Sequence, residues 1–273
     1  MKNKSVLPWF GSDASVAKEL AAMLDHCSHV TIPFAGGLSI LPHLTARGII
    51  ANDKHDDAIN VYRVIKDAGT PENVEFLARC NATLSHPAEA ELASHILAGD
   101  VEVSPSLRAW AYWASCWIGR KGKAGTKGEG GGKPSVRRRA NGGNNASRLA
   151  SAANDLSDWA AQFERCEFTC DDFETCLEDV VDCPENGIYV DAPWFEAGHL
   201  YRHGFSLNDH KRLRDSLEQF ENATVVVRYG YCNEVFELYG DDWQYVTRES
   251  RTQANKQIPE IWFVRTKRKK EQQ

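Results

Sequence analysis

The chain has 273 residues, 42% of them hydrophobic and 10% aromatic, which suffices for one large α/β domain or for a core with one insertion. No apolar run approaches the ~20 residues that span a bilayer, and the start MKNKSVLPWFGSD has no apolar stretch behind its positive charges, so we expect neither a membrane helix nor a secretory signal. The net charge of −6 is unevenly spread: residues 108–148 carry ten basic residues against the single acid Glu129, so this segment is +9 and the remainder is −15.

The eight cysteines lack paired CxxC spacing. The only local cluster is Cys166-x3-Cys170, followed by Cys176 and Cys183. Because structural zinc sites usually take their ligands from close pairs, we interpret these residues as reduced thiols and not as metal ligands. Reduced thiols predict a cytoplasmic protein.

The first seventy residues alternate between helical and strand patterns. Apolar residues recur at helical spacing from Ser15 to Cys27, and residues 29–37 form a β-branched strand that runs into a glycine turn. We expect a helix over residues 38–48, a second strand over residues 49–57 and a helix from Asp57 to Asp67. Strands that alternate with helices favour a parallel sheet with helices on its faces.

The middle of the chain reads as helical and then breaks. Residues 71–97 and 106–119 have helical patterns, and the second places Trp110, Trp113 and Trp117 on one face, an arrangement more typical of core packing than of a ligand site. Eight glycines among lysines and arginines follow between Gly122 and Asn145. This basic arm is either a contact for a polyanion or a solvated loop.

The last part of the chain returns to alternation. We expect a helix over residues 146–163, strands over residues 166–173, 188–190, 223–229 and 260–265, and a helix over residues 206–220. The sheet elements therefore flank a helical and basic insertion.

Three features lie at the ends of predicted strands. Gly36-Gly37 lets the backbone approach a ligand closely, and Asp53, at the end of the next strand, stands where nucleotide-type α/β sites place an acid that binds ribose hydroxyls. The third is the turn Asp191-Ala192-Pro193-Trp194. Ligands of open α/β sheets bind beyond the carboxyl ends of the strands, where all three features would meet.

The residues of this turn suit an exocyclic amine. The Asp191 carboxylate and a backbone carbonyl in a turn stiffened by Pro193 can accept two amine hydrogens, and Trp194 offers a face for stacking. Base stacking on aromatic side chains contributes ~1–3 kcal/mol per base. A base in a duplex reaches such a site only by leaving the stack. The alternative is a capped turn with Trp194 half buried.

The order of the motifs resembles the Dam-type family of DNA adenine-N6 methyltransferases, including its phage members, over nearly the whole chain. The stretches that carry the resemblance are WFGSDASVAKELAAML, IPFAGGLSI, IIANDKHDDAINVYRVI, FTCDDFETCL and IYVDAPWF. It implies DNA modification, as in restriction-modification, with S-adenosyl-L-methionine as cofactor, double-stranded DNA as partner and no metal, in the cytoplasm of a bacterium or a phage-infected host cell.

The resemblance also implies roles for individual residues. It implies cofactor binding by Trp9, Phe10, Pro33, Phe34, Ala35, Gly36, Gly37, Asp53, Asp172 and Phe173. It implies that Asp191, Ala192, Pro193 and Trp194 carry the chemistry on a flipped adenine. The basic segment looks like the family's target-recognition insertion, with DNA contacts from Arg120, Lys121, Lys123, Lys127, Arg137, Arg138, Arg139 and Arg148.

The chain departs from the family pattern at two places. Ser12-Asp13 stands where the family usually has Gly-Lys, and the turn has Ala192 for proline and Trp194 for tyrosine. These departures leave two alternatives open beside the DNA adenine methyltransferase. One is the same fold acting on adenine with a modified cofactor or on RNA, and the other is a catalytically silent DNA-binding relative.

The expected fold is a Rossmann-like S-adenosylmethionine-dependent methyltransferase sheet with helices on both faces and a mainly helical basic insertion. We expect residues 1–70 to form the cofactor-binding half, residues 71–162 the insertion with a flexible arm near residues 120–148, and residues 163–273 the catalytic half.

Overall fold

A computed structural model describes residues 3–99, 102–119, 123–129, 144–240, 242–251 and 257–267. The chain divides into two compact units. The helical unit comprises Met1–Ala14, Gly36–Pro42 and His55–Phe168, and the sheet unit comprises Ser15–Ala35, His43–Lys54 and Thr169–Gln273. The division expected from the sequence, with boundaries at residues 70 and 162, cuts the chain into consecutive pieces. The helical unit instead combines one long segment with two short segments from the expected cofactor-binding half.

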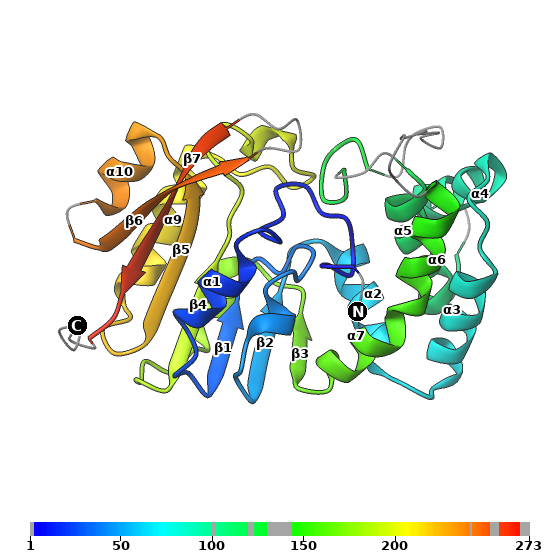
Figure 1. Cartoon of the computed structure of the whole chain (residues 1–273), viewed down its shortest axis with the longest axis horizontal. Coiled ribbons are helices and arrows are strands. Elements are labelled where there is room, and N and C mark those ends of the chain that lie inside the picture. Colours follow the sequence, from blue (N-terminus) through cyan, green and yellow to red (C-terminus); the bar gives the residue numbers. More distant parts are fainter. Residues whose placement is uncertain are drawn as a thin grey trace. The chain divides into compact units, whose positions relative to one another are not determined.

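Within the described residues, seven strands form one sheet in the order β3-β2-β1-β4-β5-β7-β6 (Figure 1). Strand β1 pairs in parallel with β2 and β4, β4 pairs in parallel with β5, and β7 is antiparallel to both β5 and β6. The strands are β1 (His29–Ile32), β2 (Gly48–Asn52), β3 (Cys166–Thr169), β4 (Asn186–Val190), β5 (Thr224–Gly230), β6 (Gln244–Arg251) and β7 (Gln257–Arg265). The chain order reverses between β1 and β4, which is where open α/β sheets bind their ligands.

Helices cover both faces of the sheet unit. On one face, Ile188 and Val190 of β4 share a core with Leu213 and Leu217. Because side chains alternate along a strand, Gly187 faces the other way, and a Cβ there would come within 2.8 Å of Leu24. The helices of this unit are α1 (Ala17–Ala22), α8 (Phe173–Glu178), α9 (Leu207–Glu218) and α10 (Asn233–Tyr239). The predicted Rossmann-like sheet is confirmed.

The helical unit is built around α5 (Pro105–Ile118), which packs against α2, α3, α4 and α6 (Figure 1). Trp110, Trp113 and Trp117 of α5 are buried, so the aromatic stripe is core, as the spacing predicts. The other helices are α2 (Asp56–Lys66), α3 (Pro71–Ala82), α4 (Pro87–Ala98), α6 (Asn145–Asn154) and α7 (Leu156–Phe163).

Several expected elements differ in the structure. The helix expected over residues 38–48 is only a 3-10 turn at Leu41–His43, because Pro42 lacks the N–H that a helix needs and Leu38 has a φ of 55°. Its apolar spacing reflects a buried loop. The helix expected over residues 146–163 is broken at Asp155, whose carboxylate accepts hydrogen bonds from the backbone and side chain of Asn3.

Three further differences concern the length and number of elements. Helix α1 is shorter than the pattern over Ser15–Cys27 predicts. Strand β6 and helix α10 were not expected; β6 is exposed at residues 244–249, so it lacks the alternation that marks a half-buried strand.

Among the helices that the structure describes, none combines the length and apolar character that crossing a bilayer requires.

The Asp182 carboxylate fixes the loop that leads into β5. It accepts hydrogen bonds from the backbone N–H groups of Glu221, Asn222 and Ala223 and from the Asn222 side chain, at 2.8–3.1 Å. Burial alone would raise the pKa of Asp182, but these donors lower it below its usual value.

We expect Asp182→Asn to lower the free energy of unfolding by ~1–3 kcal/mol at neutral pH, because backbone donors would lose their charged acceptor. Since the folded pKa is depressed, this stability is present above the unfolded pKa of ~3.9 and is lost as the pH falls through the folded value. Urea unfolding at several pH values measures the difference. The exposed Asp179→Asn is the control, and equal stability of the two variants at pH 7 would contradict the assignment.

Candidate active site

The buried side-chain amide of Asn52 ties together the carboxyl ends of β1, β2 and β3 in the sheet unit. Its Nδ2 donates to the carbonyls of Pro33 and Asp171, both at 3.0 Å. Its Oδ1 accepts from the Thr169 hydroxyl at 2.8 Å and from the Asp171 backbone at 2.9 Å. This amide therefore holds Pro33 directly, and Asp53, the next residue of the chain, donates its backbone N–H to the Thr169 carbonyl at 3.3 Å.

Three phenylalanines form an aromatic cluster beside this amide. The ring of Phe34 lies 5.6 Å from Phe173 and 5.6 Å from Phe205, and the latter two rings are 5.9 Å apart. Phe173 is buried, whereas the other two are half-buried. The structure thus brings two predicted cofactor residues, Phe34 and Phe173, together and adds Phe205.

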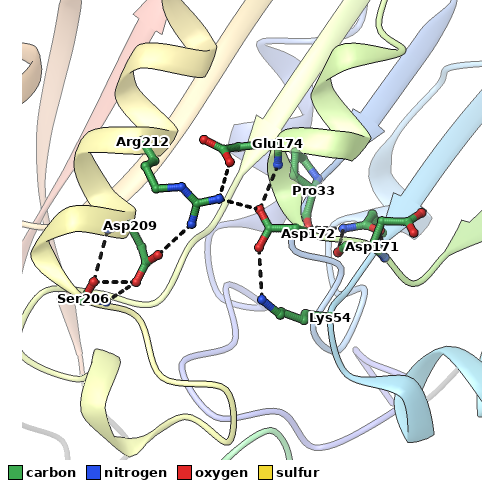
Figure 2. A network of polar contacts seen from close by, with 9 residues as sticks. Pro33, Lys54, Asp171, Asp172, Glu174, Ser206, Asp209 and Arg212 are labelled. Carbon is green, nitrogen blue, oxygen red and sulfur yellow. Dashed lines mark hydrogen bonds and ion pairs between the residues drawn. The ribbon is translucent and has the colours of Figure 1, made fainter.

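Charged groups surround the start of α8, as Figure 2 shows. The Arg212 guanidinium bonds to Asp172 at 3.2 Å, to Asp209 at 3.0 Å and to Glu174, while Lys54 reaches the other oxygen of Asp172 at 3.1 Å. Burial alone would raise the pKa of Asp172, but the hydrogen bonds from Lys54 and the Glu174 backbone, together with the positive charge of Arg212, lower it. The Asp172 carboxylate is therefore ionised and fixed, and the guanidinium lies 5.1 Å over the Phe173 ring.

The predicted catalytic carboxylate is held by a buried arginine. Asp191 follows β4 directly, and Nη1 of Arg228 lies 3.1 Å from its Oδ1 and 3.0 Å from its Oδ2. The other side of the guanidinium binds the buried Glu260. Burial alone would lower the pKa of Arg228, but the negative charges of Asp191 and Glu260 raise it well above its usual value.

Trp194 lies against the end of the neighbouring strand. A Cβ on Gly230 would come within 2.5 Å of the Trp194 ring, so only glycine leaves room for it there. The Arg228 guanidinium lies 5.0 Å from the ring centre. Asp191 and Trp194 are half-buried, so the turn presents a partly accessible carboxylate and indole. Between them, Ala192 is buried and Pro193 is half-buried.

The residue after the motif anchors it. The Phe195 ring stacks on His210 with their centres 3.7 Å apart, and His210 shares a hydrogen bond of 2.9 Å with the Tyr229 hydroxyl. Burial lowers the pKa of His210 to about 4, against the opposing charge of Asp209, so this ring is neutral at physiological pH.

Tyr201 links the two predicted acids electrostatically. Burial raises its pKa above the usual range, the negative charges of Asp191 and Asp53 raise it further, and Arg228 lowers it. Both carboxylates therefore act on the same hydroxyl. The strand ends that carry Asp53 and Asp191 thus face a common part of the sheet unit, as the parallel arrangement predicts.

In the helical unit, the ring of Trp9 is enclosed by two glycines. A Cβ would come within 3.1 Å of this ring at Gly36 and within 2.4 Å at Gly125. A Cβ on Gly37 would meet the Leu7 carbonyl at 2.8 Å. Residues 7–9 of the chain therefore approach Gly36 and Gly37 closely and fill part of the space that the missing side chains leave.

The segment that departs from the family pattern lies in the same unit. The hydroxyls of Ser12 and Ser39 are 2.7 Å apart, and Asp13 is buried. Phe10, a predicted cofactor residue, donates its backbone N–H to the Ala124 carbonyl. Residues 9–10 are thereby joined to the start of the basic arm.

Glu129, the single acid of the basic segment, anchors the base of the arm. Its carboxylate lies 2.5 Å from His55 Nε2 and accepts from the Tyr112 hydroxyl at 2.8 Å and from the Gly125 backbone at 2.6 Å. Burial alone would raise the pKa of Glu129, but the hydrogen bond and charge of His55 lower it, with smaller effects from Tyr112 and Gly125.

The predicted DNA-contacting residues fall into two groups. Arg120, Lys121, Arg137, Arg138 and Arg139 lie outside the described residues. Among the others, Lys127 is exposed and Lys123 is half-buried. Arg148 donates to the Trp117 carbonyl at 2.8 Å, so it also supports the end of α5.

Sequence reasoning missed Asn52, Arg228, Glu260 and Arg212. Two of these had a visible signal, because Arg228 interrupts the apolar run of β5 and Glu260 stands beside the apolar residues of β7. A charge in a buried strand requires a partner. Asn52 and Arg212 had none, since polar residues are ordinary at strand ends and on exposed helix faces.

The aromatic rings and carboxylates at the strand ends of the sheet unit fit a nucleoside-bearing cofactor. The aromatic cluster suits a planar base, and the Asp53 carboxylate can accept from ribose hydroxyls. The fixed charge of Asp172 lies next to this cluster.

Comparisons with known proteins extend this picture. A family model for D12 class N6 adenine-specific DNA methyltransferases matches residues 9–256. A search of curated proteins returned no match. Among solved structures, a candidate O-methyltransferase from Klebsiella pneumoniae is 9% identical, with a TM-score of 0.42 over 95% of this chain and 84% of that chain. That likeness is too distant to bear on activity.

We expect Glu129→Gln to loosen residues 123–129, because the neutral amide gives up charge-assisted hydrogen bonds of ~1.5–3 kcal/mol. Trypsin should then cleave after Lys123 and Lys127 about tenfold faster, as followed by mass spectrometry of the peptides. The exposed Glu102→Gln, which removes the same charge, is the control. Equal cleavage rates in the two variants would show that Glu129 does not anchor the arm.

Proposed function

The chain belongs to the D12 class N6 adenine-specific DNA methyltransferases, and from this premise we propose that it transfers a methyl group from S-adenosyl-L-methionine to N6 of an adenine that has left a DNA duplex. The observation that carries the proposal is the Asp191 carboxylate, which is fixed at the end of β4 beside the half-buried Trp194. The proposal assigns the chemistry to Asp191, Ala192, Pro193 and Trp194, the residues that the resemblance implies.

The turn supplies acceptors and a stacking surface. The Asp191 carboxylate and the Ala192 carbonyl would accept the two hydrogens of the adenine amine, and Trp194 would stack on the base. These hydrogen bonds turn the nitrogen lone pair out of conjugation with the ring. The base must leave the duplex to reach them.

The cofactor would supply an electrophilic methyl group on a sulfonium. Transfer of that methyl group to N6 would place positive charge on the nitrogen until its proton passes to solvent. The Asp191 carboxylate stabilises that charge. Positioning and electrostatics then supply most of the rate enhancement.

Cofactor binding would fall mainly to the strand ends of the sheet unit. Phe34 and Phe173 would flank the adenine ring, with Phe205 added to the predicted pair, and Asp53 would accept from the ribose hydroxyls. In the helical unit, Gly36 and Gly37 keep the turn after β1 free of side chains, with the Trp9 ring packed on it.

The experiment that tests the activity is mass spectrometry of nucleosides from DNA of cells that express the protein. The proposal predicts more N6-methyl-2′-deoxyadenosine than in cells with the empty vector. Another mass on deoxyadenosine would indicate a modified cofactor, modified adenosine found only in a parallel digest of RNA from the same cells would indicate another substrate, and no modification in either would indicate a silent relative.

We expect Asp191→Asn to lower methyl transfer to duplex DNA at least about 100-fold, the scale of losing a group that acts on developing charge. Cofactor affinity measured by calorimetry should stay within a few-fold. Asp53→Ala should show the converse, weaker cofactor binding by ~1.5–3 kcal/mol. The exposed Asp215→Asn on α9 is the control, and transfer by Asp191→Asn at the control's rate would contradict the role of Asp191.

We expect replacement of Arg137, Arg138 and Arg139 by alanine to flatten the dependence of DNA affinity on salt. Each phosphate neutralised contributes a log–log slope of about −0.9, so the slope should change by up to ~3 units. Turnover at saturating DNA should change much less. A matched control replaces the exposed Lys18, Lys211 and Lys267 by alanine, and equal slopes for the two triple variants would leave the arm a solvated loop.

A further inference from the structure

Strand β5 carries a buried charge that the proposed chemistry has not used. The side chain of Arg228 is only 3% exposed, in a strand whose preceding residues are all buried. Removing a guanidinium from water costs several kcal/mol, which only close partners offset. The groups that bind Arg228 therefore indicate the role of its buried charge.

The register of the sheet brings these partners together. β4 and β5 pair Val190 with Val227, so Asp191 and Arg228 occupy the next positions of the two strands. On the other side, β7 places Trp262 opposite Arg228 and Glu260 opposite Gly230. Because alternate residues share a face, all of these side chains lie on one face of the sheet.

The guanidinium divides its donors between two carboxylates. Nε and Nη2 bind the two oxygens of Glu260 at 3.1 and 2.6 Å, a bidentate pair, and Glu260 also accepts from the indole of Trp262 at 3.3 Å. Nη1 binds Asp191, at 3.0–3.1 Å from its two oxygens. The contact with Nη1 orients the Asp191 carboxylate, whose oxygens would accept from the substrate amine in the proposed reaction.

The same guanidinium supports the stacking residue. It lies 5.0 Å from the ring of Trp194, which rests on Gly230. A cation within about 6 Å of an indole attracts it. One buried group thus touches both the carboxylate and the indole of the turn.

We propose that Arg228 is the residue that positions Asp191 and Trp194 for the reaction, and that Glu260 cancels its charge so that the cluster of Asp191, Arg228 and Glu260 keeps a net charge of −1. The inference rests on the proposed function. A guanidinium alone beside Asp191 would oppose the positive charge that develops on nitrogen, and the buried Glu260, 1% exposed, removes that opposition.

The proposal makes opposite predictions for the two partners of the cluster. Loss of the Arg228 charge should raise the pKa of Asp191, because a favourable neighbour is gone, whereas loss of the Glu260 charge should lower it. Tyr201 and Tyr229 also sense the charge of Asp191, and both have raised pKa values, so they remain neutral over the working pH range. A cluster that served stability alone would leave kcat unchanged at pH values where Asp191 is ionised, even though the loss of a neighbouring charge would still shift the pKa of Asp191.

The test measures the acid limb of the pH–kcat profile for transfer to duplex DNA. For Arg228→Gln we expect the limb to move up by about one pH unit and kcat to fall at least about tenfold. For Glu260→Gln we expect a lower kcat with the limb unmoved or moved down, and unchanged KM values. The control is Arg214→Gln, another buried arginine of the same unit, which pairs with Glu218 and Asp242 and should leave the limb in place.

A second variant and a second measurement distinguish failure of this proposal from misfolding and from failure of the proposed function. If Arg228→Gln does not fold, Arg228→Met combined with Glu260→Leu removes both charges, a change that buried pairs often tolerate, and it should still raise the limb. Titration of the Asp191 carboxyl by carbon NMR, assigned against Asp191→Asn, needs no turnover. A wild type that methylates nothing refutes the proposed function, whereas an Asp191 pKa equal in wild type and in the double variant refutes the role of Arg228.

Discussion

The buried amide of Asn52 is the interaction on which the arrangement of the strand ends depends. Parallel strands leave their last backbone groups unpaired where the chain departs from the sheet, and buried groups of this kind need partners. One side chain meets this need for the turn after β1 and the residues before α8, and it also accepts from the Thr169 hydroxyl at the end of β3. Phe34 and Phe173 of the aromatic cluster and both acids of the proposed cofactor site lie within two residues of Asn52 or of the backbone groups that its amide binds.

Two arginines bind and neutralise carboxylates at the strand ends of the sheet unit. Arg212 compensates the charge of Asp172, and Arg228 compensates that of Asp191, but their surroundings differ. Arg212 is partly exposed and shared among three carboxylates, an arrangement that solvent screens. Arg228 is buried, so its interactions are strong and its removal costly. The protein thus places the stronger electrostatic control at the proposed reacting centre and the weaker one at the proposed cofactor ring.

Much of this arrangement is predictable from the sequence, because hydrophobic periodicity and strand-end residues are local signals. The alternation of strands and helices predicts the sheet, and the aromatic spacing predicts the core of α5. The pairing of Arg228 with Asp191 and Glu260 joins three segments far apart in the chain, so no local pattern contains it. The helix expected over residues 38–48 failed for a related reason, since burial of Leu38, Ile40 and Leu41 in a loop produces the same periodicity as a helix face.

The enclosure of Trp9 by Gly36 and Gly125 has a consequence for evolution. Neither glycine position has room for a side chain while an indole occupies residue 9. A smaller residue there would remove the steric conflict at both positions at once and leave only their positive φ values of 49° and 81° to favour glycine, so changes at the three sites are not independent. Among relatives, we expect these positions to vary in concert, with glycine kept at 36 and 125 wherever a large ring stands at 9. The turn after β1 and the first residues of the arm therefore share one steric constraint and one history.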